Sequence, residues 1–458
     1  MNNAGMQLPP QFRRLLWGAY GHSGPFHGAL LLARLVQRHG LSAGRAHFRA
    51  LPPGDLGMVE QKLRTDQRYL LNRAERLGPV FKCNTRTRLL IVVVGNELAR
   101  RIFAAHGEGL TSRHKDLDAL FPIGHLRSMR GEQHRRYRQM FVRAVRPELI
   151  AGCESELLAI ASGVIGPLAA EVGEAGVATR RAITALREVT TRMLIRLFLG
   201  VDPESALGAR VRDSYDRLAA GFAPAYTYTG RNLAFEEIRE VVHERARDLA
   251  QGSGGQGDSV LARLVGQGAL DDTAVGNLIY MIESGRFDLF SLFRWIVYYL
   301  ARSPGLTARL RAERTDADAA TVSLAKACVL ETLRSNQSEA IQRFLTEDLE
   351  FEGYFFPAGS QLRICLWEAH KDPLTFPAPF EFDPERFRRA DYSMNEFAPF
   401  GMDHHRCVAS EYVVALGTVF VQALADYDVR AIGDGSPVWG AYHWEPSPGF
   451  AFGLTPSQ

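Results

Sequence analysis

Residues 400–409 read Phe-Gly-Met-Asp-His-His-Arg-Cys-Val-Ala, and this stretch constrains the fold and the chemistry of the chain more than any other. The early glycine and aspartate favour a tight turn with positive φ, and apolar residues recur at helical spacing from Val413 onward. Cys407 is therefore expected to end a loop and to open a helix. There the helix dipole and unpaired backbone N–H groups favour the anionic thiolate, which binds metals. The alternative is a small buried hydrophobe, a common role of free cysteine.

The stretch resembles the signature of the cytochrome P450 family, in which a phenylalanine, a basic residue and a small residue surround the cysteine that binds haem. Phe400, His405, Cys407 and Ala409 fill those places, whereas Asp403 replaces the more common glycine. The resemblance implies haem b (iron protoporphyrin IX) as cofactor, with Cys407 as axial ligand of the iron and His405 as a cofactor contact. A thiolate ligand pushes electron density onto haem iron and favours O–O cleavage.

A second matching segment is Glu-Thr-Leu-Arg at residues 331–334, in a stretch without Gly or Pro that predicts a helix. Residues three apart share a helix face, so Glu331 can bind Arg334 through two parallel charge-assisted bonds. Most pairs of this kind are exposed and contribute little. In the family, however, Glu-x-x-Arg binds a later arginine and holds the haem-side core together. The resemblance assigns that arginine to Arg386.

Three further basic residues are candidates for binding the haem propionates. His134 and Arg138 are four residues apart, so they share one helix face and repel each other unless an anion lies between them. Family members carry His-x-x-x-Arg in the corresponding helix. Arg343 precedes a turn and a His-x-Asp-Pro sequence at residues 370–373, the order in which the family's arginine contacts a propionate. The alternatives are a basic solvated helix face and an ordinary surface arginine.

The long helix expected over residues 278–302 departs from the family pattern. It should carry Ala/Gly-Gly-x-Asp/Glu-Thr next to the haem, but residues 284–288 read Ser-Gly-Arg-Phe-Asp. Gly285 is expected to keep room against the haem. Phe287 takes the place of the acid and Asp288 that of the alcohol, the two groups that transfer protons in the family. Asp288 is therefore a candidate catalytic residue.

Two orientations of Asp288 are open. It can face the pocket, where it would transfer protons or bind a cationic or hydroxylated substrate, or it can point away and pair with Arg286 or Arg294. Residues 110–128 and 222–233 are expected, from their family position, to cover the substrate pocket.

Three hypotheses for function follow. The first is a haem-thiolate oxidoreductase that performs monooxygenase-type oxidation of a small organic substrate, natural-product or lipid-like, with electrons from a ferredoxin and its reductase. The second is an atypical haem-thiolate enzyme without ordinary O2 activation, such as a peroxygenase, oxidative coupler, isomerase or dehydratase. The third is a non-catalytic haem or ligand-binding protein.

Composition agrees with a large folded protein. The 458 residues are 46% hydrophobic, enough for a large core. A strand signal at Leu89–Val94 precedes a mostly helical region over residues 98–345. The expected fold class is mainly α with a small β-sheet region, and the resemblance implies the cytochrome P450 fold. We expect one haem-thiolate domain over residues 51–458, after an N-terminal leader over residues 1–50 that is suited to docking on a membrane or partner surface.

Charge and cysteine content exclude several classes. A net charge of +3 is too small to indicate a nucleic-acid partner, although it suits an acidic electron donor. The five cysteines show no paired spacing, which indicates a reducing compartment and therefore the cytoplasm. No apolar run approaches the roughly 20 residues of a transmembrane segment.

Overall fold

The computed structural model describes residues 24–57, 59–85, 88–112, 124–169, 175–220, 228–252, 258–268, 270–315, 322–337, 340–440 and 443–457. Two compact units are present, each assembled from segments far apart in sequence. The first contains residues 1–113, 339–377 and 393–403, and the second contains residues 114–338, 378–392 and 404–458.

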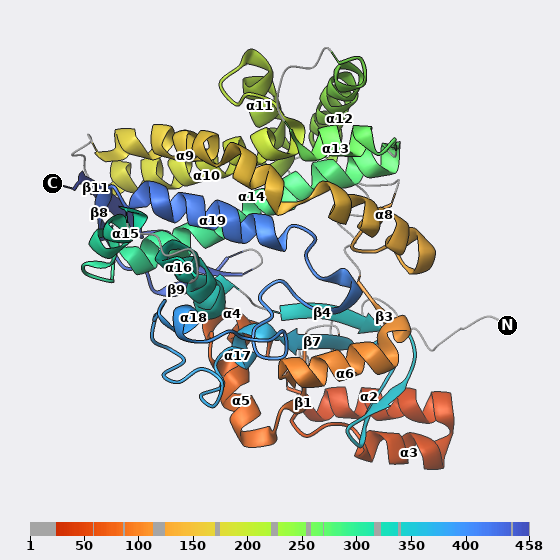
Figure 1. The fold of residues 1–458 in the computed structure, drawn as a ribbon. Helices are drawn as coiled ribbons and strands as arrows, with labels where there is room; N and C mark the ends of the chain where they lie inside the picture. The colour runs from red at the N-terminus through yellow and green to blue at the C-terminus, as the bar shows by residue number, and fades with distance from the viewer. Residues whose placement is uncertain are drawn as a thin grey trace. The chain divides into compact units, whose positions relative to one another are not determined.

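The first unit contains a five-stranded mixed sheet with the order β1-β2-β7-β4-β3 (Figure 1). The predicted strand Leu89–Val94 is confirmed as β2. It pairs antiparallel with β1 and parallel with β7, and its first five residues are buried, as expected of an apolar strand covered on both faces. The remaining strands of this sheet are β1 (Val80–Asn84), β3 (Leu110–Thr111), β4 (Ala340–Leu345) and β7 (Gln361–Cys365).

A short hairpin and several helices complete the first unit. The chain turns at Glu352 and Gly353, which have φ values of 52° and 76°. These turns separate β5 (Leu349–Phe351) from β6 (Tyr354–Phe356). The helices are α2 (Gly24–His39), α3 (Leu41–Arg49), α4 (Glu60–Thr65), α5 (Tyr69–Leu77), α6 (Asn96–His106), η1 (Gly107–Gly109) and α17 (Leu366–Ala369).

The second unit is largely helical, so the mainly α prediction with a small sheet region is confirmed. Its longest helix, α14 (Asp272–Leu300), begins earlier than predicted because Asp271 caps it by accepting a hydrogen bond from Ala274 N at 2.8 Å. Figure 1 shows α9, α10, α14 and α19 packed alongside one another. The other helices are α8 (Gly131–Ala144), α9 (Pro147–Ala169), α10 (Ala175–Leu199), α11 (Ala206–Ala220), α12 (Tyr228–Ala250), α13 (Val260–Gly266), α15 (Leu306–Thr315), α16 (Leu324–Thr332), α18 (Arg386–Arg389) and α19 (Ser410–Leu424).

One antiparallel hairpin, one further pair of antiparallel strands and two short helices finish the second unit. β9 pairs with β10 and β8 pairs with β11, and the β9–β10 hairpin packs on α14. Their bounds are β8 (Tyr427–Ile432), β9 (Pro437–Trp439), β10 (Trp444–Pro446) and β11 (Ala451–Pro456). A π-helix, η2 (Leu333–Gln337), follows α16, and a 3-10 turn, η3 (Asp403–His405), precedes Cys407.

One described helix, α9, is long and apolar enough to cross a membrane by length and composition. It packs against α10, α19 and β11, which is how a core helix of a folded domain behaves. The absence of a transmembrane segment stays a prediction.

The predicted leader ends within the first unit, where α2 and α3 lie against each other. Residues 1–23 lie outside the described part of the chain. The leader and the single domain over residues 51–458 therefore stay predictions.

Candidate active site

The loop before α19 positions Cys407. Gly401 and Asp403 adopt positive φ values of 75° and 65°, so the predicted tight turn is confirmed. α19 begins at Ser410, three residues after the cysteine rather than at it. Gly417 allows α19 to approach α16 closely, since a Cβ at this position would lie 2.9 Å from Val329 Cγ1. The cysteine is therefore held at the end of a helix that is tightly packed in the core.

The thiol of Cys407 faces an enclosed space. Its side chain keeps exposed surface, yet it lies so deep that burial raises the pKa of the thiol to about 11. Those two facts agree if the side chain lines an internal cavity. The Ala409 N–H and the cations Arg138 and Arg406 act in the opposite direction and lower the pKa of Cys407. The expected effect of a backbone N–H group is present, since the Ala409 N–H lowers the pKa of Cys407, but desolvation outweighs it. A bound metal would deprotonate such a thiol.

The predicted cofactor contacts His134, Arg138 and His405 meet next to Cys407. His134 is buried on α8, and its ring packs against that of His405 with centroids 4.2 Å apart. Arg138 Nη1 donates a hydrogen bond to the carbonyl oxygen of Arg406 at 2.7 Å. α8 therefore supplies two basic side chains to the loop that carries the thiol. An anionic ligand such as the haem propionates fits this cluster of basic groups.

Arg343 lies in the first unit, on β4. It is buried, donates from Nη1 to the carbonyl oxygen of Gln342 at 2.9 Å, and its guanidinium lies 5.7 Å from the ring centroid of Phe103. A buried guanidinium is unusual and is consistent with a role in binding an anion. Its contact with a propionate stays a prediction.

Gly285 does not serve the purpose expected of it. A Cβ at this position would lie 3.3 Å from Leu194 Cδ1, so Gly285 faces α10 and permits close packing of the two helices. Tyr280, Ser284 and Asp288 follow at intervals of four and share another face of α14. This face is less buried than the neighbouring positions Ile282 and Leu289, as expected for residues that line a cavity.

Asp288 lies on that cavity-lining face. Its side chain keeps exposed surface, while burial raises the pKa of its carboxyl above the ordinary value. The positive charges of His443 and Arg127 act against this and lower it. The negative charge of Asp288 in turn contributes to the raised pKa of Cys407. Asp288 is therefore among the charged groups that act on the Cys407 thiol.

The two arginines considered as partners of Asp288 bind other groups. Arg286 donates to Thr191 Oγ1 at 2.9 Å and to Glu283 Oε2 at 3.2 Å, and it also pairs with Asp216. Arg294 Nη1 lies 2.5 Å from Glu445 Oε2. The orientation of Asp288 toward the pocket is therefore the better supported of the two predicted alternatives.

Sequence reasoning missed three polar residues near Asp288. Burial raises the pKa of Tyr280, the guanidinium of Arg127 lowers it, and the charges of Asp288 and Cys407 raise it further. Arg127 precedes α8, and His443 precedes β10. Of the three, only Tyr280 carries a local signal, because it shares a face of α14 with Asp288. Of the predicted pocket covers at residues 110–128 and 222–233, residues 113–123 and 222–227 lie outside the described part of the chain.

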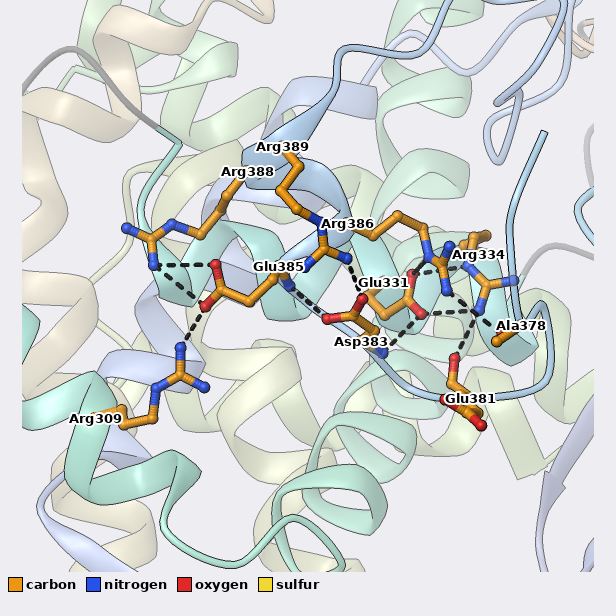
Figure 2. A network of polar contacts seen from close by, with 10 residues as sticks. All are labelled: Arg309, Glu331, Arg334, Ala378, Glu381, Asp383, Glu385, Arg386, Arg388 and Arg389. Atoms are coloured by element: carbon orange, nitrogen blue, oxygen red, sulfur yellow. Dashed lines mark hydrogen bonds and ion pairs between the residues drawn. The ribbon is translucent and has the colours of Figure 1, made fainter.

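The predicted core ion pair is present and fully buried. Arg334 donates from Nε and Nη2 to the two carboxylate oxygens of Glu331 at 2.7 and 2.8 Å. Arg386 Nε lies 3.5 Å from Glu331 Oε2, and Asp383 N donates to Oε1 at 3.0 Å. Arg334 also donates to the carbonyl oxygens of two residues in the irregular segment, at 2.8 Å to Pro379 and 3.1 Å to Glu381. Figure 2 shows Glu331 between the two arginines.

Haem retention should depend on the face of α8 that carries His134 and Arg138. We expect His134→Ala combined with Arg138→Ala to weaken haem binding clearly, because the pair lies on the face of α8 that meets the Cys407 loop. The matched control is Arg135→Ala with Arg143→Ala, which removes two exposed residues of the same helix. Transfer of haem to apomyoglobin measures the loss. Equal rates for the two double variants would show that α8 merely carries a solvated basic face.

Comparison with known proteins identifies the fold. The family model described as cytochrome P450 matches residues 289–409. Cytochrome P450 88A1 of Zea mays is 25% identical over 52% of this chain and 52% of its own length. Abscisic acid 8'-hydroxylase 2 of Oryza sativa subsp. indica is 24% identical over 91% of this chain and 87% of its own. The structure of retinoic acid-bound cyanobacterial CYP120A1 has a TM-score of 0.70 and 20% identity, and covers 89% of this chain and 99% of its own.

The fold and the cysteine loop define a haem-thiolate protein. The family model, the relatives and the structural neighbours all support the cytochrome P450 family. Members of this family bind haem, iron protoporphyrin IX, through a cysteine thiolate, and haem is the cofactor. The residues fit this cofactor, because an enclosed thiol with basic groups next to it matches both the iron and the propionates.

Proposed function

We propose that the protein is a haem-thiolate monooxygenase that oxidises a small organic substrate with electrons from a ferredoxin-type partner. The observation that carries this proposal is the loop that presents Cys407 before α19, with the basic side chains of His134, His405 and Arg138 next to it. Bound haem supplies oxygen and electron chemistry. Cys407 would hold the iron through its thiolate, and His134, Arg138 and His405 would neutralise the propionates. Arg343 keeps its predicted role as a propionate contact.

The pocket residues indicate the substrate class. Tyr280, Arg127 and Asp288 present hydroxyl, cationic and acidic groups in or beside the cavity. A substrate with an apolar body and one polar group, natural-product or lipid-like, suits such a lining. Abscisic acid and retinoic acid, named for one relative and one structural neighbour, are molecules of this kind.

An acidic iron–sulfur protein is the proposed electron donor. The chain carries a small positive net charge, and α8, next to the Cys407 loop, exposes Arg135 and Arg143. Positive surface charge near the haem would favour encounter with a negatively charged donor. The free cysteines in the described residues agree with a cytoplasmic location.

A second candidate function follows from residues 284–288. Phe287 stands where the family's acid is expected and cannot carry a proton, while Asp288 replaces the alcohol. A peroxygenase, oxidative coupler, isomerase or dehydratase would not need the usual acid and alcohol pair. A non-catalytic role in binding haem or another ligand ranks last among the three candidate functions.

The choice of oxidant separates these functions. Purified holoprotein is supplied with NADPH and a ferredoxin–reductase pair, with hydrogen peroxide, or with neither, and product formation is measured over a panel of terpenoid and fatty acids. Turnover that requires NADPH and the redox partners supports the monooxygenase. Turnover with peroxide alone, or with no oxidant, would replace it by the second candidate.

A further inference from the structure

Basic charge is concentrated at the N-terminal end of the chain. The chain has 54 lysines and arginines and 51 acidic residues, and six of the arginines but none of the acidic residues precede Asp55. The side chains of residues 1–54 therefore have a formal charge of +6, whereas the remaining 48 basic and 51 acidic side chains give −3. Such an asymmetry indicates a local interaction with a negatively charged surface.

Four of these arginines lie on α2 and α3, which pack against each other as a helical hairpin (Figure 1). Gly40 has a φ of 84° and turns the chain between the two helices. Gly44 lets α3 approach α2 closely, because a Cβ at this position would lie 2.6 Å from Val36 Cα. Close backbone packing therefore fixes one helix of the hairpin against the other.

The inner face of the hairpin is anchored on the first unit. Leu35 is buried in the hydrophobic core of that unit, and Phe48 packs against the same core. The ring of His47 stacks on that of Phe355 in β6, with centroids 4.0 Å apart. Phe355 N also donates to the carbonyl oxygen of Ala50, directly after α3, at 2.8 Å. These contacts leave the opposite face of both helices exposed.

The exposed face of each helix carries one leucine followed by two arginines at intervals of four residues. The exposed residues of this pattern are Leu30, Arg34 and Arg38 in α2, and Leu41, Arg45 and Arg49 in α3. Residues four apart share a helix face and are about 6 Å apart along the axis. The two leucines are 38% and 58% exposed, which is unusual for large apolar side chains of the described residues. Arg38 also lies 3.4 Å from Asp348 Oδ1, with half of its side chain exposed.

The chemistry of this face suits anionic lipid. A cluster of four or more arginines on an amphipathic helical surface attracts negatively charged headgroups, and guanidinium groups bind phosphate well. Leucines next to the arginines can enter the boundary between headgroups and acyl chains. Exposed alanines at positions 29, 33, 43 and 46 are short, so they let the helices approach a flat surface. The combination of leucine and arginine along both helices favours a lipid surface over an acidic protein.

We propose that the exposed face of the α2–α3 hairpin docks the protein on an anionic lipid surface. The arginines bind lipid phosphates, and Leu30 and Leu41 insert at the headgroup boundary. This docking is peripheral and requires no transmembrane segment. It does not depend on the proposed haem-thiolate function. The cytoplasmic leaflet of a membrane carries anionic lipid, so the docking agrees with the proposed location.

Vesicle sedimentation of the full-length holoprotein tests the docking. We expect binding to vesicles of equal parts phosphatidylcholine and phosphatidylglycerol, and none to phosphatidylcholine alone. Combining Arg34→Gln, Arg45→Gln and Arg49→Gln should lower the partition coefficient roughly 100-fold, because each arginine near an anionic surface contributes a factor of about five. Lysine at the same three positions should retain binding. Leu30→Gln with Leu41→Gln should lower the coefficient roughly tenfold.

The matched control removes the same charge elsewhere. Arg210→Gln, Arg309→Gln and Arg314→Gln together replace three arginines that are paired with acidic residues, and this variant should bind vesicles like the wild type. A wild type that fails to bind the anionic vesicles, or binds phosphatidylcholine equally well, would overturn the proposal. Equal losses in the hairpin and control variants would do the same. Binding by a wild type without a thiolate carbonyl spectrum would support the docking and overturn only the proposed function.

Discussion

Glu331→Ala should yield little soluble, haem-loaded protein. Glu331 is fully buried between Arg334 and Arg386, so its removal leaves two buried cations without their carboxylate. Breaking a buried pair in this way costs about 3–5 kcal/mol of unfolding free energy, a large share of the stability of most domains. The same carboxylate accepts a hydrogen bond from Asp383 N, so the irregular segment at residues 378–392 should also loosen. Chemical denaturation and haem content per chain measure the two effects.

Glu385→Ala is the matched control in the same region. Glu385 pairs with Arg309 and with Arg388, at 3.4 Å from the latter, and its side chain is partly exposed (Figure 2). Removing a partly exposed pair should cost less than about 1 kcal/mol. If Glu331→Ala and Glu385→Ala melted alike and retained haem alike, the buried network would have no special role in the core.

The residues that could be located from sequence are those fixed by local backbone geometry or by a recognisable motif. Gly401 and Asp403 were expected to turn with positive φ, and they do. Glu331 and Arg334 were expected to share a helix face, and they pair. The burial of that pair is not a local property, because it depends on a segment some 50 residues later in the chain. The family pattern indicated this burial, whereas the spacing of the two charges did not.

The rotation of α14 was not predictable in the same way. Gly285 was expected to face the haem, but it packs against Leu194 of α10, a neighbour that no helical pattern identifies. The partners of Arg286 and Arg294 likewise come from α10, α11 and the β9–β10 hairpin. Which face of a buried helix meets which neighbour is decided by tertiary packing.

The state of Cys407 also needed the structure. From sequence, the helix N-terminus favoured a thiolate, but burial raises the pKa of this thiol to about 11 and outweighs the Ala409 N–H, Arg138 and Arg406. The protein without metal should therefore hold a neutral thiol at neutral pH. Binding of iron would displace that proton, which makes haem loading weaker as the pH falls.

Cys407→Ala should abolish the thiolate signature of the haem. The side chain lines the enclosed cavity, so its removal deletes the axial sulfur while the basic residues His134 and Arg138 remain. Haem that still binds would then lack a thiolate ligand. Cys153→Ala is the control, because Cys153 is buried in α9 and donates its S–H to the carbonyl oxygen of Leu149 at 3.0 Å.

The central claim is that Cys407 ligates haem iron as a thiolate. Thiolate and imidazole ligands give different absorption for ferrous carbonyl haem, so the carbonyl difference spectrum of the purified protein tests it most directly. We expect the red-shifted Soret band of a thiolate complex in the wild type and in Cys153→Ala, and its loss in Cys407→Ala. A wild-type spectrum without that band, or a Cys407→Ala spectrum identical to the wild type, would contradict the assignment.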